Sequence, residues 1–84
     1  MLSEPMTLYK LMNLYMLKKV NFPLTNAQLT DFFLQHEYAS YFTLQQALGE
    51  LKDSGLIHAE STHSTTRYEI TKEGEETLNF FENN

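Results

Sequence analysis

The chain has 84 residues, of which 42% are hydrophobic and 13% aromatic, so it has enough apolar material for one folded domain over residues 1–84. It contains no cysteine, which excludes disulfides, thiolate metal sites and a cysteine nucleophile. The formal net charge is −5, and the acids concentrate after residue 22, where ten of them oppose three bases, which argues against a strongly basic nucleic-acid surface.

The first segment is not expected to be a targeting signal. Residues 1–5 include no basic residue, and the apolar run that follows is interrupted by Lys10 and Asn13 and ended by Lys18 and Lys19. A signal peptide needs a basic start, and a membrane helix needs about 20 apolar residues. We therefore expect a soluble, cytoplasmic protein.

A first helix is predicted from Pro5 to about Lys19, because proline is tolerated in a first helical turn and lysines suit the negative end of the helix dipole. Its apolar side chains sweep about 220° of the surface, which is more than a one-sided surface helix shows. Other helices or a second subunit must cover it. We assign Tyr9, Met12, Met16 and Phe80 to a homodimer interface.

Residues 21–23 break the chain, and Leu24 is expected to bridge to a later hairpin. Thr25 and Gln28 match a capping box, in which each side chain bonds the other's free backbone N–H. A second helix is predicted over residues 26–35. One face of it holds Leu29, Phe32, Phe33 and His36.

A third helix follows the turn at residues 37–40, with Ser40 as its N-cap and Gly55 taking the left-handed conformation after its end. Its core face is predicted to hold Leu44, Ala47, Leu48 and Leu51. Its outward face is predicted to hold Phe42, Gln45, Gln46, Gly49, Glu50 and Asp53.

Residues 56–61 and 66–70 alternate as strands, with Tyr68 and Ile70 inward and Arg67 and Glu69 outward. Thr71 is the predicted cap of a fourth helix. The buried line of that helix is expected to run through Gly74, Leu78 and Phe81, while Phe80 points away from it.

The order of three helices, a hairpin and a helix, with Gly55-Leu56-Ile57 and Tyr68-x-Ile70-Thr71-x-x-Gly74, resembles the PadR and MarR winged-helix regulators. The segments at residues 8–10, 21–25 and 41–46 more closely resemble a bacterial PadR-like family of uncharacterised function. The resemblance implies an α+β, mostly helical winged helix-turn-helix. It also implies that residues 41–54 enter the major groove of DNA and that the wing at residues 61–67 touches the backbone or minor groove.

The candidate DNA contacts follow from this placement. Glutamine pairs bidentately with adenine and threonine meets the thymine methyl, so the start of the third helix has side chains suited to reading bases. The proposed base contacts are Tyr41, Thr43, Gln45 and Gln46, and the proposed backbone contacts are Lys52, His63 and Arg67.

Each of these interpretations has an alternative. The polar side chains can be the solvated face of an amphipathic helix, and Arg67 can pair with Glu60 across the hairpin. Gly49 can admit a DNA backbone or be a tolerated glycine. Phe42 is expected to wedge beneath the turn between the second and third helices, the alternative being an exposed anchor for a protein partner.

Neither catalysis nor a cofactor is predicted. The histidines at 36, 58 and 63 lack a metal-ligand spacing, and no nucleophile, phosphate loop or facing carboxylate pair can be argued. The first hypothesis is a homodimeric, double-stranded DNA-binding transcriptional regulator. The second is a protein-interaction module that uses Phe42, Phe80 and the acidic last helix, and a regulator with an effector pocket at the dimer seam stays open.

Overall fold

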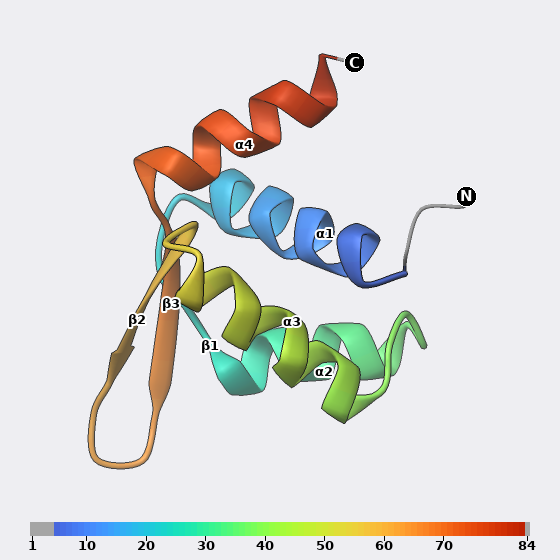
Figure 1. The fold of residues 1–84 in the computed structure, drawn as a ribbon. Helices are drawn as coiled ribbons and strands as arrows, with labels where there is room; N and C mark the ends of the chain where they lie inside the picture. The colour runs from blue at the N-terminus through green and yellow to red at the C-terminus, as the bar shows by residue number, and fades with distance from the viewer. Residues whose placement is uncertain (1–4, 84) are drawn as a thin grey trace.

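The computed structural model describes residues 5–83 as an α+β winged helix-turn-helix (Figure 1). In chain order the elements are α1 (Pro5–Val20), β1 (Leu24–Thr25), α2 (Asn26–Gln35), α3 (Tyr41–Asp53), β2 (Ile57–Ser61), β3 (Thr66–Ile70) and α4 (Lys72–Glu82). None of the helices in residues 5–83 is long and apolar enough to span a lipid bilayer.

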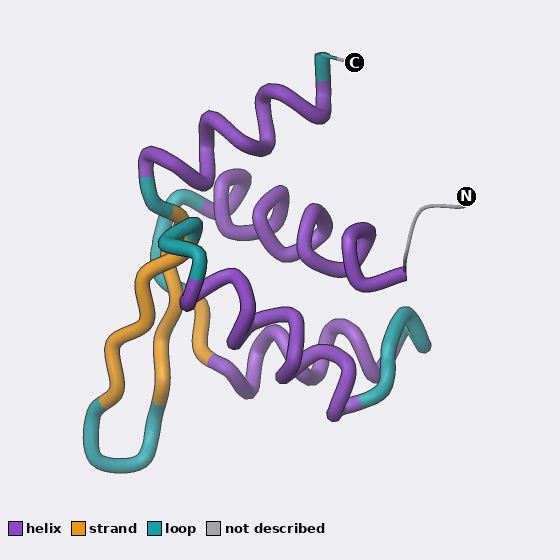
Figure 2. The backbone as a smooth tube through the Cα atoms, viewed as in Figure 1, coloured by secondary structure: helices purple, strands orange, loops and turns teal. Residues whose placement is uncertain are grey.

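The three strands form an antiparallel sheet in the order β1-β3-β2. Leu24 lies opposite Tyr68, so the expected bridge between residue 24 and the hairpin is confirmed. In Figures 1 and 2 the sheet stands at one end of the molecule, and α1 passes between α4 on one side and the α2–α3 pair on the other. The hairpin of β2 and β3 extends past the helices as the wing.

Each predicted cap is formed. The Gln28 backbone N–H donates to Thr25 Oγ1 at 3.0 Å while the Thr25 N–H donates to Gln28 Oε1 at 2.9 Å, which confirms the capping box. The side chains of Ser40 and Thr71 cap α3 and α4 by accepting from the backbone N–H groups of Thr43 and Gly74. These bonds satisfy N–H groups that a helix start leaves free, and so they fix where each helix begins.

The end of α3 is closed by Gly55, whose φ of +78° lies in the left-handed region that glycine adopts without strain. Its N–H donates to Lys52 O, and the Leu56 N–H donates to Leu51 O, both at 3.0 Å. This pair of bonds is the Schellman arrangement, and it turns the chain directly into β2.

One apolar core joins the four helices and the sheet. Leu14 and Leu17 of α1 meet the inward residues of α2, α3, the sheet and α4. The buried side chains of the two helix-turn-helix helices are Leu29, Phe33, Leu44, Ala47, Leu48 and Leu51. The predicted core face of α3 is therefore confirmed.

Gly74 lets α4 begin against the sheet. A Cβ atom at this position would overlap the Leu56 carbonyl oxygen and approach Ile70 Cγ1 to 2.7 Å. The Leu56 carbonyl also accepts from the Thr71 N–H at 3.1 Å, so this close approach joins the start of β2 to the start of α4.

Three apolar or aromatic side chains lie elsewhere than the sequence predicts. Phe81 is 47% exposed rather than buried, because α4 diverges from α1 towards its C-terminal end (Figure 1). His36 is exposed and stacks on Tyr38 at 5.6 Å between ring centroids. Phe42 does not wedge beneath the turn; it is 82% exposed.

Asn13 is fully buried in the middle of α1. Its Nδ2 donates to the Tyr9 carbonyl oxygen at 2.8 Å, whereas its Oδ1 has no hydrogen-bond partner among residues 5–83. A buried acceptor left unbonded destabilises the fold, so Asn13 is a local weak point of α1.

Candidate nucleic-acid interface

The outward face of α3 is set by its leucines. Leu44, Leu48 and Leu51 are buried against the core, and this turns the opposite side of the helix away from the protein. The hairpin leaves the C-terminal end of α3 and extends beside it (Figure 1). A helix and a wing therefore share one side of the molecule.

The start of α3 presents two aromatic rings. Tyr41 is 48% exposed, and its ring meets Phe42 edge to face at 5.7 Å. Thr43 follows but is half-buried, and its hydroxyl accepts from Ser40 Oγ at 2.9 Å within the cap. Of the first residues of α3, Tyr41 and Phe42 are the ones open to a macromolecule.

Gln45 lies differently from its predicted outward position. Its side chain is half-buried and forms an amide pair with Asn26 of α2: Gln45 Nε2 donates to Asn26 Oδ1 at 3.1 Å, and Asn26 Nδ2 donates to Gln45 Oε1 at 2.8 Å. Gln45 Nε2 also donates to Thr30 Oγ1 at 3.2 Å. Both ends of the amide are used inside the protein.

The same cluster reaches the sheet. Asn26 Nδ2 donates to the Tyr68 hydroxyl of β3 at 3.1 Å, and Thr30 Oγ1 donates to Asn26 Oδ1 at 3.1 Å. The side-chain amides and hydroxyls of α2, α3 and β3 thus form one network. It fixes α3 relative to the wing, and Gln45 acts in it as a positioning residue.

Gln46 is exposed, as predicted. Its Nε2 donates to Glu50 Oε2 at 3.0 Å, one turn further along α3. Glu50 Oε1 in turn pairs with Lys10 Nζ of α1 at 2.6 Å. The bond from Lys10, followed by the one from Gln46, holds the pKa of the Glu50 carboxyl below its ordinary value.

The wing is a short, polar hairpin whose turn is closed by a bond from the Thr62 N–H to Thr65 O at 2.8 Å. His63 is exposed in this turn. Arg67 is exposed on β3 and lies directly opposite Glu60, yet the two form no ion pair within 4.0 Å. The alternative interpretation, in which Arg67 pairs with Glu60 across the hairpin, is therefore wrong.

A polar groove of about 540 Å³ runs between the start of α2 and the wing. Tyr41 lines it from α3, Asn26 from α2, and Thr65 and Arg67 from the wing, while Asp31 contributes a carboxylate. The groove brings together two of the predicted contact residues, Tyr41 and Arg67.

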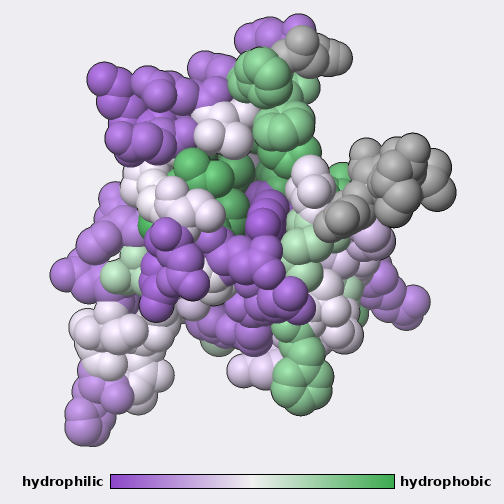
Figure 3. All heavy atoms as spheres, viewed as in Figure 1, coloured by the Kyte–Doolittle hydropathy of each residue, from purple (hydrophilic) through white to green (hydrophobic). Residues whose placement is uncertain are grey.

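The other predicted backbone contacts lie apart from this groove. Lys52 is exposed near the C-terminal end of α3, and His63 is at the wing tip. Figure 3 shows a mostly hydrophilic surface over α3 and the wing, apart from hydrophobic atoms at the start of α3, and further hydrophobic atoms gather along the C-terminal end of α4. The exposed ring of Phe42 therefore interrupts an otherwise polar face.

The predicted dimer residues lie on α1 and α4. Met12 and Met16 line an apolar groove beside α1, Tyr9 is half-buried against the core, and Phe80 is 64% exposed. Among residues 5–83, no group of three or more histidine, aspartate or glutamate side chains is placed to hold a metal ion.

Sequence reasoning missed Asn26, Thr30 and Tyr68 as partners of the α3 helix. Asn26 and Gln45 are 19 positions apart, and Asn26 and Tyr68 are 42 apart. Helix periodicity places Gln45 at the flank of the core face but carries no information about which helix covers that flank.

The comparisons with known proteins give one match. A family model described as a domain of unknown function, DUF4364, matches residues 9–84. Neither a curated protein nor a solved structure matches the chain.

Proposed function

The chain belongs to the DUF4364 family of domains of unknown function, and from that premise we propose that it is a DNA-binding transcriptional regulator. It is of the PadR/MarR kind, acts in the cytoplasm as a homodimer, and reads double-stranded DNA with α3 and the wing. The observation that carries the proposal is the exposed start of α3, with Tyr41 and Gln46, beside a polar groove that reaches Arg67 on the wing.

Gln46 is the proposed base reader. One N–H of its amide is held by Glu50, which leaves the second N–H and the carbonyl oxygen for a base. That donor and acceptor match adenine N7 and N6 in the major groove. Glu50 thus orients the amide before DNA arrives.

Tyr41 and the polar groove are the proposed contacts to the sugar–phosphate backbone next to the bases that Gln46 reads. Tyrosine, threonine and arginine side chains commonly bond phosphate oxygens, and such bonds set the register of a protein on DNA. Lys52 and His63 are proposed to hold the backbone further away. Gln45 is proposed to position α3 rather than to read a base, because its amide is occupied by Asn26 and Thr30.

The decisive experiment is selection from a random duplex library at two salt concentrations, followed by gel-shift assays of the selected sequence. The wild-type chain is expected to prefer adenine over another base at the contacted position by about 1 to 3 kcal/mol of binding free energy, and Gln46→Ala is expected to lose this preference. The circular dichroism spectrum of the variant is expected to match that of the wild-type chain. Lys72→Ala, outside the proposed interface, is the control: it removes a positive charge and is expected to leave the preference for one base over another unchanged. Recovery of no sequence motif at either salt concentration contradicts the proposal.

A second function is favoured by one observation. Phe42 is 82% exposed and forms a ring pair with Tyr41, and paired exposed aromatics are typical anchors of protein interfaces. In this alternative the domain binds a protein through Tyr41 and Phe42. In that case Phe42→Ser no longer captures the protein partner that the wild-type chain captures. The wild-type chain itself shifts no duplex in a gel.

A further inference from the structure

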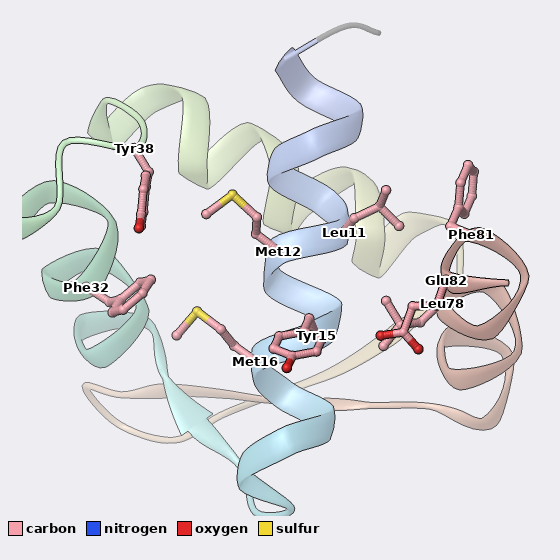
Figure 4. A pocket seen from close by; sticks show the side chains of 9 residues that line it. All are labelled: Leu11, Met12, Tyr15, Met16, Phe32, Tyr38, Leu78, Phe81 and Glu82. Carbon is pink, nitrogen blue, oxygen red and sulfur yellow. The ribbon is translucent and has the colours of Figure 1, made fainter. Parts of the chain in front are cut away.

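Phe42 is the most exposed of the large apolar side chains in residues 5–83, with 82% of its surface open. Other exposed rings lie in apolar surroundings. Tyr15 and Phe81 border the groove along α1 (Figure 4), and Phe80 meets Phe81 edge to face at 5.5 Å. Phe42 lies instead on the outward face of α3, where its ring meets that of Tyr41 at 5.7 Å. The ring therefore needs an explanation separate from that of the apolar groove.

Phe42 and Gln46 share one face of α3, because residues four positions apart lie one above the other on a helix. Both are exposed. Glu50 lies one turn further along the same face, where its carboxylate accepts from Gln46 Nε2 at 3.0 Å and pairs with Lys10 Nζ at 2.6 Å. The groups that this face offers to DNA near the start of α3 are therefore the ring of Phe42 and the remainder of the Gln46 amide.

Thr43 is poorly placed to be the thymine contact that its side-chain type suggests. It is half-buried, its hydroxyl accepts from Ser40 Oγ at 2.9 Å, and its backbone N–H donates to the same oxygen at 3.2 Å. The cap of α3 thus holds Thr43 against the protein. Phe42, one position earlier, is the apolar side chain that the start of α3 exposes.

Thymine presents a group that suits this ring. Its C5-methyl is apolar, it lies in the major groove among the polar edges of the bases, and phenylalanine is one of the side chains that contact it. A protein interface needs a much larger area, since such interfaces bury about 800 Å² on each partner. Phe42 is followed along its face of α3 by Gln46 and Glu50, so a methyl group among polar base edges fits its surroundings better.

We infer that Phe42 reads a thymine, by contact of its ring with the C5-methyl group, next to the adenine that Gln46 reads. The inference rests on the proposed function and adds a specificity-determining residue to it. The edge-to-face contact with Tyr41 restrains the ring, which lowers the conformational entropy that the side chain loses on binding.

The spacing of the two side chains limits where the thymine lies. Four residues of α-helix span about 6 Å, and successive base pairs are about 3.4 Å apart. The thymine read by Phe42 is therefore expected within about two base pairs of the adenine read by Gln46, on either strand.

Replacing thymine by deoxyuridine tests the inference, because uracil keeps the hydrogen-bonding groups of thymine and lacks only the methyl group. The duplex selected from the random library is resynthesised with one thymine replaced at a time. For the wild-type chain, a replacement within about two base pairs of the Gln46-dependent adenine is expected to raise the Kd about threefold to fivefold, because one methyl group is no longer buried. Replacements elsewhere in the duplex are expected to leave the Kd unchanged.

The same duplexes are then titrated with variants that circular dichroism shows to be folded. Phe42→Ala is expected to bind more weakly than the wild-type chain and to bind the thymine and uracil duplexes equally, because the ring that contacts the methyl group is gone. Phe42→Leu keeps an apolar side chain and is expected to retain part of the methyl dependence. The matched control, Phe22→Ala, removes a ring that is 57% exposed between α1 and β1, and it is expected to retain all of it.

Two results overturn the inference and leave the proposed function intact. One is a selected duplex in which no thymine near the Gln46-dependent adenine is sensitive to the loss of its methyl group. The other is a sensitivity that is the same in Phe42→Ala as in the wild-type chain. If Phe42→Ala also binds every duplex as tightly as the wild-type chain, the result favours a protein partner for the exposed ring. Recovery of no duplex at all contradicts the proposed function, and the inference falls with it.

Discussion

At the scale of single residues, neighbouring glutamines have opposite roles. Gln45 and Gln46 are adjacent in the sequence, yet the first bonds Asn26 and Thr30 inside the protein and the second bonds Glu50 at the surface. Their difference comes from which side of α3 another helix covers. Amino-acid type alone cannot distinguish them.

Gln45→Ala is expected to lower the free energy of unfolding by about 1 to 3 kcal/mol, because in a half-buried site it leaves one N–H of the Asn26 amide without its acceptor and removes the two bonds that Gln45 Nε2 donates to Asn26 and Thr30. Gln46→Ala is the matched control and is expected to change it by less than about 0.5 kcal/mol. Urea denaturation of both variants measures the difference. Equal effects of the two substitutions contradict the roles assigned to them.

Asn13→Leu is expected to stabilise the protein by about 1 kcal/mol, because leucine has nearly the same branched shape and removes a buried acceptor that has no partner. Asn13→Asp, which introduces a charge at the same place, is expected to destabilise it by several times that amount. Thermal and urea unfolding check both. A destabilised leucine variant indicates that the Nδ2 bond to Tyr9 outweighs the unbonded Oδ1.

Glu50 gives the expected pH dependence. Lys10 and Gln46 lower its pKa in the folded protein, so its pairing contributes stability above the unfolded pKa and loses it as pH falls through the folded value. In Lys10→Met, the Glu50 pKa is expected to rise towards its ordinary value. Carboxyl chemical shifts measured by NMR against pH follow the change, and an unaltered titration argues that the ion pair does not persist in solution.

At the scale of elements, the sequence is most informative where the chemistry is local. Thr25, Ser40, Thr71 and Gly55 act on groups within a few positions of themselves, and each forms the cap or turn predicted for it. Phe81 depends instead on the divergence of α4 from α1. That angle is set by packing between helices and cannot be obtained from the periodicity of one of them.

The glycines of α3 and α4 provide a matched pair. Gly74→Ala is expected to destabilise the fold by about 2 kcal/mol or more, because the added Cβ overlaps the Leu56 carbonyl. Gly49→Ala meets no atom within 4 Å and is expected to stabilise α3 by up to about 1 kcal/mol. The urea concentrations at the midpoint of unfolding compare the two variants, provided that the dependence of the unfolding free energy on urea is the same for both. Stabilisation by both substitutions refutes the close approach of α4 to the sheet.

At the scale of the whole molecule, two grooves lie at different parts of the surface, one between α2 and the wing and one along α1. The winged-helix architecture follows from the order of the elements and was predictable from the sequence. The polar groove at the wing and the apolar groove at α1 were not, since each is lined by residues from three separate parts of the chain.

The net charge of −5 limits how strongly such a protein binds DNA. With about two to three phosphates neutralised per protomer, a dimer is expected to show a slope of about −4 to −5 in log K against log salt, from roughly 0.9 per phosphate. Titrations of a selected duplex at several salt concentrations measure it. A slope steeper than about −8 requires cationic contacts beyond Lys52 and Arg67.

The Asn26 side chain links α3 and β3, the two elements proposed to contact DNA at separate places. Because its amide bonds both Gln45 and the Tyr68 hydroxyl, α3 cannot tilt without disturbing β3, and the two are expected to travel together as a rigid unit. A rigid unit of this kind loses little conformational entropy when it binds. Any mismatch between its shape and a straight duplex must then be accommodated by bending the DNA, so operators that flex easily are expected to be preferred even at base pairs that no side chain touches.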